Sequence, residues 1–323
     1  MSNTQYAFAV AKVRQLENNL LSRAQLDQMI NASDISEIIA VLSQKGWQTG
    51  EDSTDLERLL NNELNSAWEL VNELAPDSAE LKTIVVKNDF HNLKVAVKAL
   101  VSGVSPQEYF IYPTFVDTDN IIEALSDKDY DFLPVYLREV AEEAYNAITL
   151  TGDGQLAEVI IDRAALQAIN DFAQTGKSEI VKSYADLMIL ASDIKIAFRG
   201  AAAGKKEQFF EQAICGNKHL NRDLLIKAAV RGTDEVLNFL TASGFADYTD
   251  ALKTSLSAFE KLCDERQAAL INEAALTSFG IDPVVAYYLA KENEIKNVRI
   301  ILICKNMGAD VATIAERVRE VNV

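Results

Sequence analysis

Apolar residues along the chain recur at helical spacing, and one helix ending occurs three times. The stretch "LSQKGW" (42–47) returns as "LSDKDY" (125–130) and as "LTASGF" (240–245). Before each copy, apolar residues fall at i, i+1 and i+4, which places them on one face of a helix. The pattern predicts three helices that each stop just before an aromatic residue, marked by Leu42, Trp47, Leu125, Tyr130, Leu240 and Phe245.

The first copy predicts both ends of its helix. Asp34, with Glu37 three residues later, fits a capping box at the start. At the end, a left-handed Gly46 would place Trp47 against Leu42, which is the hydrophobic contact of a Schellman ending. We therefore expect the aromatic residue to pack in the core, and direct contact with a partner is the alternative.

The other two copies follow the first with one difference. Gly244 and Phe245 repeat the glycine–aromatic pair. In the middle copy Asp129 stands at the glycine position, and Asp tolerates a left-handed backbone better than most residues do. We expect Asp129 to adopt that conformation.

A second pattern places basic residues on otherwise apolar helices. The stretch "NDFHNLKVAVKAL" (88–100) resembles "NEIKNVRIILICK" (293–305), and "SDIKIAFRGA" (192–201) is a weaker copy. In this register Asn92 pairs with Asn297, and Asp193 takes the same position. The basic residues are Arg14, Lys94, Lys195 and Arg299, with Lys98 and Arg199 one turn further on.

The spacing of these residues predicts the domain organisation. Lys94, Lys195 and Arg299 are separated by roughly a third of the chain each time, which favours three similar units. Long amphipathic segments at 52–75, 134–148 and 251–271 follow the three aromatic marks, and glycine (13) and proline (5) are scarce. We predict an all-α fold of three similar helical-bundle domains, with these limits: 1–105, 106–215 and 216–323.

Composition and charge narrow the class of partner. The 323 residues carry a net charge of −17 without a Lys/Arg-rich block, which disfavours nucleic acid as a partner. The three cysteines are far apart and form no CxxC pair, so we expect buried thiols in a reducing compartment and no zinc site. The first ten residues do not resemble a signal peptide. The apolar run 284–290 is too short to span a bilayer.

The sequence offers little catalytic chemistry. His91 and His219 are the two histidines, and neither has a carboxylate partner at metal-ligand spacing. The stretch "GAAAGKK" (200–206) is one residue short of a phosphate-binding loop, has Lys206 where Ser or Thr belongs, and follows a helical pattern. A small-residue turn at a helix C-terminus fits it better. We therefore expect no cofactor, no metal, no directly bound nucleotide and no enzymatic activity.

The opening of the chain, residues 6–47, resembles that of a known family. It is similar to the central-stalk C subunit of V-type and A-type ATPases, whose eukaryotic vacuolar counterpart is called the d subunit. Length, helicity and the basic residues of the later units agree, so the resemblance covers essentially the whole chain. Within the opening it is carried by Tyr6, Ala7, Ala11, Arg14, Glu17, Leu20, Leu21, Leu26 and Trp47.

The resemblance implies a funnel-shaped protein of three similar helical domains around a pseudo-threefold axis. Such a protein lies peripherally on the cytoplasmic face of the membrane rotor ring of c/K subunits. Its socket receives the rotor shaft, which the D and F subunits form. It hydrolyses nothing and transmits torque for ATP-coupled transport of H⁺ or Na⁺.

Two questions stay open at this point. The six basic residues are predicted to line the socket or to bind carboxylates of the shaft or ring, and the alternative is that they pair with acidic residues of neighbouring helices. For the whole chain, the alternative function is a freestanding all-helical adaptor that is not linked to ion transport. A small-molecule enzyme on a helical scaffold is a third candidate, which the scarcity of histidine disfavours.

Overall fold

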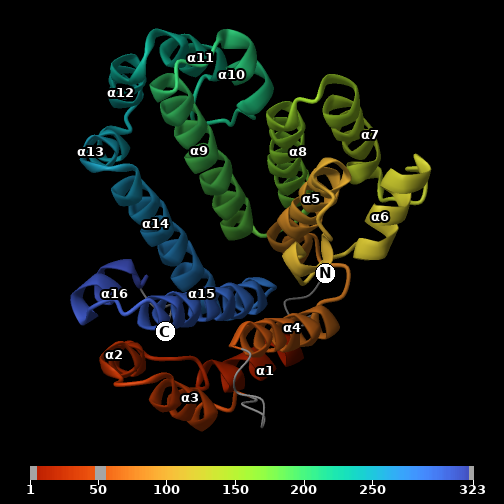
Figure 1. Ribbon diagram of the computed structural model, residues 1–323. Coiled ribbons are helices and arrows are strands. Elements are labelled where there is room, and N and C mark those ends of the chain that lie inside the picture. The colour runs from red at the N-terminus through yellow and green to blue at the C-terminus, as the bar shows by residue number, and fades with distance from the viewer. Residues whose placement is uncertain (1–5, 48–55, 320–323) are drawn as a thin grey trace. The chain divides into compact units, whose positions relative to one another are not determined.

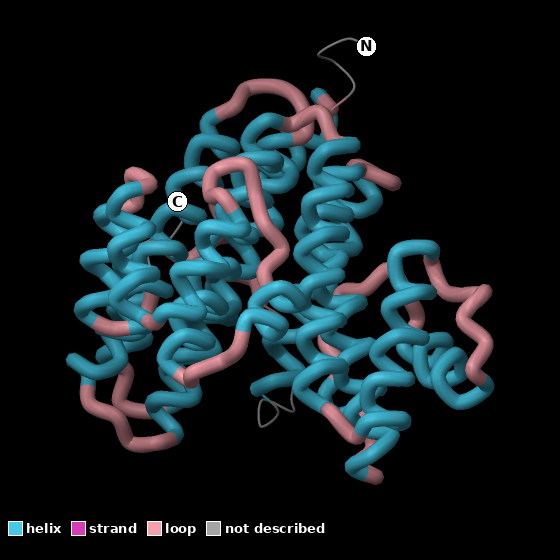
Figure 2. Tube along the Cα trace, turned by 90° about the horizontal axis from the view of Figure 1, so that it is seen from above, coloured by secondary structure: helices cyan, strands magenta, loops and turns pink. Residues whose placement is uncertain are grey.

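The computed structural model describes residues 6–47 and 56–319, and the regular structure in these ranges is helical (Figures 1 and 2). It consists of sixteen α-helices and one short 3₁₀-helix, with no strand in the same ranges. The predicted all-α fold class is thereby confirmed. Proline interrupts the one strand-like stretch, 109–116, which forms a 3₁₀ turn and a loop.

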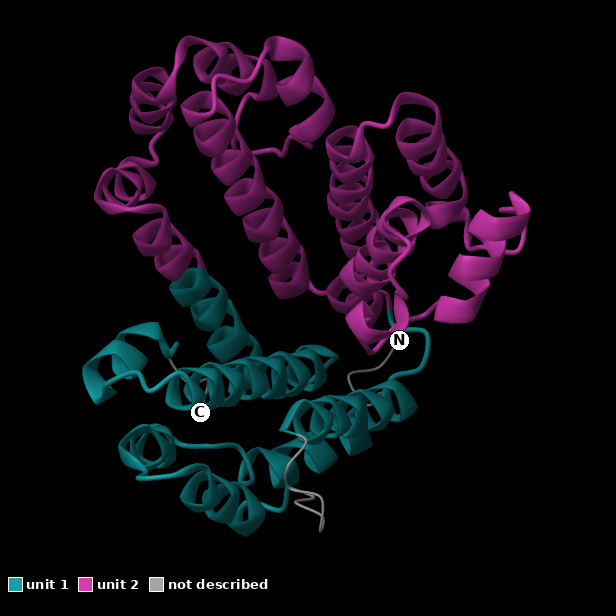
Figure 3. Ribbon diagram, in the orientation of Figure 1, with its two compact units in different colours: residues 1–78, 264–323 teal, residues 79–263 magenta. Residues whose placement is uncertain are grey.

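The chain divides into two compact units (Figure 3). Unit 1 contains residues 1–78 and 264–323, so it includes both ends of the chain, and unit 2 contains residues 79–263. The division into three similar bundles at 105 and 215 stays a prediction.

In unit 1, residues from the N-terminal and the C-terminal parts of the described chain share an apolar core. Leu42 and Trp47 from the N-terminal part pack in the same cluster as Val298 and Ile301 from the C-terminal part. Its helices are α1 (Ala7–Glu17), α2 (Arg23–Asn31), α3 (Ile35–Gln44), α4 (Leu56–Leu74), the second part of α14 (Leu256–Leu276), α15 (Asp282–Asn306) and α16 (Val311–Arg317).

Helix α15 runs through the middle of unit 1. Pro283 at its first turn fits a helix start, because proline lacks the N–H that would have no partner there. The apolar run 284–290 is buried, and α15 contacts α1, α2, α4 and α16. A helix that is buried on most sides needs no amphipathic pattern, which explains the apolar run.

Among the apolar side chains that pack in unit 2, two groups contain three aromatic rings each. The first includes α5 to α8, where the Tyr136 ring contacts Phe90 and Phe172. In the second, Tyr248 contacts Phe245 and Phe259. Its helices are α5 (Ala79–Ser102), a 3₁₀-helix η1 (Gln107–Tyr109), α6 (Thr118–Asp127), α7 (Val135–Thr151), α8 (Gly154–Thr175), α9 (Glu179–Ala202), α10 (Glu207–Ala213), α11 (Arg222–Arg231), α12 (Thr233–Ala242), α13 (Ala246–Thr254) and the first part of α14.

The first and third repeated helix endings form as the sequence predicts. Gly46 has φ +85°, and the Trp47 N–H donates to the Leu42 carbonyl at 3.2 Å. Gly244 has φ +88°, and the Phe245 N–H donates to the Leu240 carbonyl at 2.9 Å. These are the bonds of the Schellman motif. Trp47 is buried in the core of unit 1, whereas Phe245 is half-buried.

The middle copy ends differently, and the prediction for Asp129 is wrong. The left-handed residue is Lys128, with φ 57°. The Asp129 carboxylate instead accepts a hydrogen bond from the Asp131 N–H at 3.1 Å, which builds a side-chain turn after the helix. Tyr130 is partly buried against the core that contains Leu125.

Candidate partner-binding surfaces

Three long helices carry the predicted basic residues: Lys94 lies on α5, Lys195 on α9 and Arg299 on α15. Each follows a fully buried apolar residue, and these residues are Leu93, Ile194 and Val298. The aligned register therefore corresponds to one local arrangement, in which an apolar side chain faces the core and the next residue is basic.

The structure gives these basic residues acidic partners within the chain. Each pair joins a long helix to a neighbouring one: α5 to α8, α9 to α14, and α15 to α4. This is the alternative that the sequence left open, and binding of a partner by the same residues stays a prediction. The pairs are Lys94 with Asp162, Lys98 with Glu158 (2.6 Å), Lys195 with Glu260 (2.9 Å) and Arg299 with Glu57 (3.1 Å).

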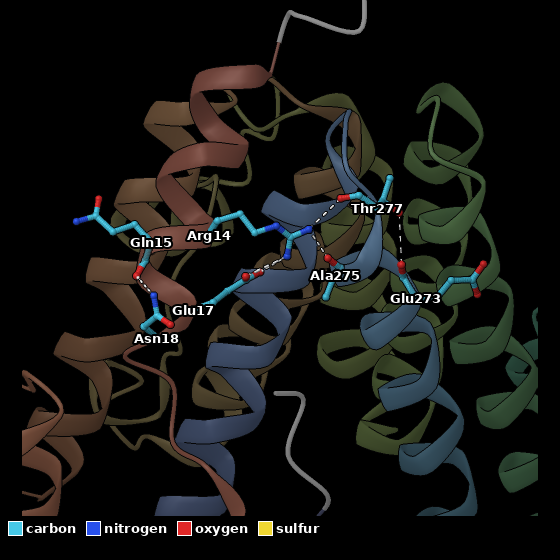
Figure 4. Close-up of polar contacts among 7 residues, drawn as sticks. All are labelled: Arg14, Gln15, Glu17, Asn18, Glu273, Ala275 and Thr277. Atoms are coloured by element: carbon cyan, nitrogen blue, oxygen red, sulfur yellow. Dashed lines mark hydrogen bonds and ion pairs between the residues drawn. The ribbon is translucent and has the colours of Figure 1, made fainter.

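Arg14 has both a carboxylate and backbone partners (Figure 4). Its guanidinium donates to Glu17 on the same helix at 2.8 Å, and to the carbonyls of Ala275 and of Thr277, the latter at 2.9 Å. These carbonyls belong to the C-terminal end of α14, where backbone acceptors lack helical partners and a positive charge is favoured. Arg14 thus ties α1 to the end of α14 inside unit 1.

Arg199 is the exception among the six predicted basic residues. It is exposed near the C-terminal end of α9, and no carboxylate in the described part of the chain lies within ion-pair distance of it. Binding of a partner by Arg199 stays a prediction.

The polar residues two positions before Lys94, Lys195 and Arg299 have a structural role that the sequence did not reveal. Asn92, Asp193 and Asn297 are buried, and each holds the backbone of a segment that follows 19 to 23 residues later. Buried backbone groups need such partners. The bonds join Asn92 to the N–H and carbonyl of Ile111 (both 2.9 Å), Asp193 to the N–H groups of Cys215 (2.9 Å) and Gly216 (2.8 Å), and Asn297 to the N–H (2.8 Å) and carbonyl (3.2 Å) of Arg319.

Burial changes the acidity of two carboxyl groups in unit 2. Burial raises the pKa of Asp193 to about 6, although its two backbone hydrogen bonds act in the opposite direction. Burial likewise raises the pKa of Asp89 to about 6, against hydrogen bonds from the Tyr136 hydroxyl and the N–H groups of Phe115 and Val116. Both groups are structural, since each accepts hydrogen bonds from backbone N–H groups of the protein itself.

A buried charge network in unit 1 also escaped the sequence patterns. The Lys291 ammonium lies 2.7 Å from both Glu63 and Glu294, and it lies 4.9 Å from the centre of the Trp47 ring. The second oxygen of Glu294 accepts a hydrogen bond from the Leu21 N–H. Burial by itself lowers the pKa of Lys291, but the two carboxylates outweigh it and raise the pKa. Lys291 therefore stays charged. A lysine directly after the apolar run 284–290, with Glu294 three residues further on, could have signalled this network.

The stretch at 200–206 forms the predicted helix C-terminus. Gly204 has φ +64°, and the Lys205 N–H donates to the Gly200 carbonyl at 2.9 Å, which ends α9 as a Schellman motif. A Cβ atom on Gly200 would lie 2.4 Å from the Phe210 ring, so close packing against α10 requires glycine there. The small residues serve helix packing.

The described residues contain no candidate metal-binding group and no candidate membrane-spanning helix. Within them, no group of three or more His, Cys, Asp or Glu side chains could hold a metal ion. The helices of the same ranges include none that is long and apolar enough to cross a membrane.

Comparison with known proteins connects these features to a family. A model of the family described as ATP synthase (C/AC39) subunit matches residues 9–317. The chain belongs to this family. The resemblance seen in residues 6–47 is thereby confirmed, and it extends along nearly all of the described chain.

Individual relatives match over similar lengths. The C subunit of the V-type sodium ATPase of Enterococcus hirae is 27% identical, over 96% of both chains. The C subunit of the A-type ATP synthase of Methanocaldococcus jannaschii is 23% identical, over 92% of this chain and 82% of that protein. The C subunit of the A-type ATP synthase of Methanococcoides burtonii is 24% identical, over 96% of this chain and 92% of that protein. V-type and A-type relatives thus both match over most of their lengths.

Proposed function

We propose that this chain is a non-catalytic central-stalk component of a V/A-type rotary ATPase, in which it links the rotor shaft to the membrane rotor ring. The observation that carries the proposal is the family match from residue 9 to residue 317. The relatives that match over most of their lengths are named as C subunits of a V-type ATPase and of A-type ATP synthases. The shaft partners are the D and F subunits, and the ring consists of c/K subunits.

The proposed body has three similar helical domains that form a funnel-shaped socket. The three long helices support it, because each has a buried polar residue that holds a later segment and a basic residue two positions on. Transmission of torque requires a body that resists deformation. Closely packed helices are stiff, because protein interiors have low compressibility.

The basic residues have different roles in this proposal. Arg199 is exposed and unpaired within the described chain, so it binds a carboxylate of the shaft or ring directly. Lys98 and Lys195 form exposed pairs, which are worth about 0–1 kcal/mol and can be exchanged for a partner's carboxylates. Arg14 is bound to two helix-end carbonyls and is the least suited to exchange.

In a rotary complex the chain would lie on the cytoplasmic face of the membrane as a peripheral component. The complex transports H⁺ or Na⁺. The ring contains the ion ligands, so the ring and not this chain determines which of the two ions is transported. The alternative function, a freestanding helical adaptor, predicts a partner outside any rotary complex.

Ion transport in membrane vesicles tests the proposed function. Vesicles from cells that lack this chain should lose ATP-driven uptake of the ion that the rotary enzyme transports, H⁺ or Na⁺, and the wild-type chain should restore it. The purified full-length chain should show no ATP turnover. Undiminished uptake without the chain would favour the adaptor, and ATP turnover by the chain would show that it is an enzyme.

A further inference from the structure

The loop between α5 and α6, residues 103–117, exposes an unusual set of side chains for a connecting segment. We call it the aromatic loop. Large exposed apolar surfaces on soluble proteins commonly mark interaction sites. The exposed apolar and aromatic side chains of this loop are Val104, Tyr109, Ile111, Tyr112 and Phe115.

The aromatic loop is held in place along α5. Four polar side chains on that helix, spread over little more than one turn, bind its backbone. A segment that is already ordered loses less conformational entropy when a partner binds. His91 bonds the Tyr109 carbonyl (3.3 Å), and the Asn88 amide donates to the Pro113 carbonyl (2.8 Å). Asn92 donates to the Ile111 carbonyl and accepts from the Ile111 N–H (2.9 Å each), and the Asp89 carboxylate accepts from the Phe115 N–H (2.9 Å).

The aromatic loop and the segment that follows it are strongly acidic in sequence. Between residues 103 and 133 the chain has seven carboxylates and a single basic residue, Lys128. All seven side chains are exposed, and Lys128 lies over the Tyr145 ring. The acidic residues are Glu108, Asp117, Asp119, Glu123, Asp127, Asp129 and Asp131.

We propose that the aromatic loop is a docking surface for a protein segment that carries Lys or Arg around apolar side chains. Tyrosine is enriched among the residues that dominate interface energies, and opposite charges at the rim favour the correct partner. The same carboxylates repel an anionic lipid headgroup, so a bilayer fits the surface less well. The inference rests on the proposed function, because the partner is sought in the shaft and the ring.

Calorimetry of the full-length chain with two probes tests the surface. The probes are the purified D–F shaft and the detergent-solubilised rotor ring. The Tyr109→Ser/Tyr112→Ser variant removes the two tyrosine side chains, which are 56% and 46% exposed. We expect its affinity for one of the two probes to fall about 30-fold or more.

A matched control separates the aromatic loop from general loss of apolar surface. Leu224→Ser/Val230→Ser changes two side chains of α11 that are 49% and 45% exposed, outside the loop. We expect its affinity for both probes to stay within about twofold of the wild-type value, which is less than about 1 kcal/mol. Circular dichroism of both variants checks that the fold is retained.

Salt dependence tests the charge of the partner. Glu108→Lys reverses one exposed carboxylate within the loop. It should weaken binding at low salt, and the difference from wild type should shrink as salt screens the charges. Tighter binding of Glu108→Lys would show an acidic partner and would overturn the proposal.

The remaining outcomes separate the proposal from the proposed function. If the wild-type chain binds shaft or ring and the tyrosine variant binds equally well, the docking surface is wrong and the proposed function stands. If the wild-type chain binds neither, both fail. Vesicles of phosphatidylcholine with and without phosphatidylglycerol form the last arm: binding that depends on the tyrosines, with protein binding unchanged, would assign the loop to lipid and overturn the proposal.

Discussion

Lys291 in unit 1 and Lys98 in unit 2 both lie on long helices and both contact carboxylates, but their surroundings differ. The Lys291 side chain is 5% exposed, and its two partners, Glu63 and Glu294, are largely buried as well. The Lys98 side chain is 52% exposed, and its partner Glu158 is 42% exposed. Water screens the second pair and leaves the first almost unscreened.

The difference shows that a basic residue on an apolar helix can have two opposite roles. A buried pair is costly to break, because the remaining charge has no solvent. An exposed pair adds little to stability, so its lysine can change partners. The buried network therefore stabilises the fold of unit 1. The exposed pairs lie on the surface, where other proteins can bind.

The largest expected effect comes from breaking the buried network. Lys291→Met keeps most of the length of the side chain but leaves the carboxylates of Glu63 and Glu294 without their cation. We expect a loss of about 3–5 kcal/mol in the free energy of unfolding. Urea denaturation of the full chain measures it. Adding Glu294→Gln should recover part of the loss, because one uncompensated charge is then removed.

The matched control for this change is Lys98→Met, which breaks the exposed pair with Glu158. Its cost should be about 1 kcal/mol or less. Equal losses in the free energy of unfolding for the two variants would show that burial does not distinguish the two ion pairs. The contrast between a stabilising buried network and an exchangeable surface pair would then be wrong.

A smaller effect follows from the charge of the buried polar residue in α9. The pKa of Asp193 is raised to about 6 in the folded chain, above the ordinary value of 3.8. The folded state therefore binds the proton more tightly, and the stability from this group is lost as pH rises through 6. Between pH 5 and 7.5 this loss is about 1 kcal/mol.

Asp193→Asn should remove this part of the pH dependence, as measured by urea denaturation at both pH values. The equivalent position in α15 already has an amide, Asn297, which is also buried. The reciprocal change, Asn297→Asp, should introduce a loss of stability with rising pH. An unchanged slope in Asp193→Asn would contradict the assignment of the raised pKa.

Much of the fold follows from local sequence patterns. The Schellman endings at Gly46 and Gly244 were predictable because glycine is the residue that adopts a left-handed backbone without strain. The middle ending was not, since Lys128 and Asp129 can each take that conformation. In the structure Lys128 takes it, and the Asp129 carboxylate accepts a hydrogen bond from the Asp131 N–H. The segment 251–271 likewise breaks at Ser255, whose hydroxyl accepts from the Ala258 N–H and starts α14.

The candidate surfaces were harder to predict. The sequence located Arg14, Lys94 and Arg299, but their partners come from helices far away in the chain. The spacing of residues along one helix does not predict which distant helix supplies the partner. Asn297 could have been found, because it aligns with Asn92 and Asp193, but its role depends on a backbone segment that only the folded chain places beside it.

The most direct test of the central claim asks whether this chain joins two other parts of a rotary complex. The purified D–F shaft and the solubilised rotor ring are mixed with and without the full-length chain, and the particles are sized by sedimentation velocity. We predict one particle that contains shaft, chain and ring when the chain is present, and separate shaft and ring when it is absent. Equal association of shaft and ring without the chain would contradict its role as the link.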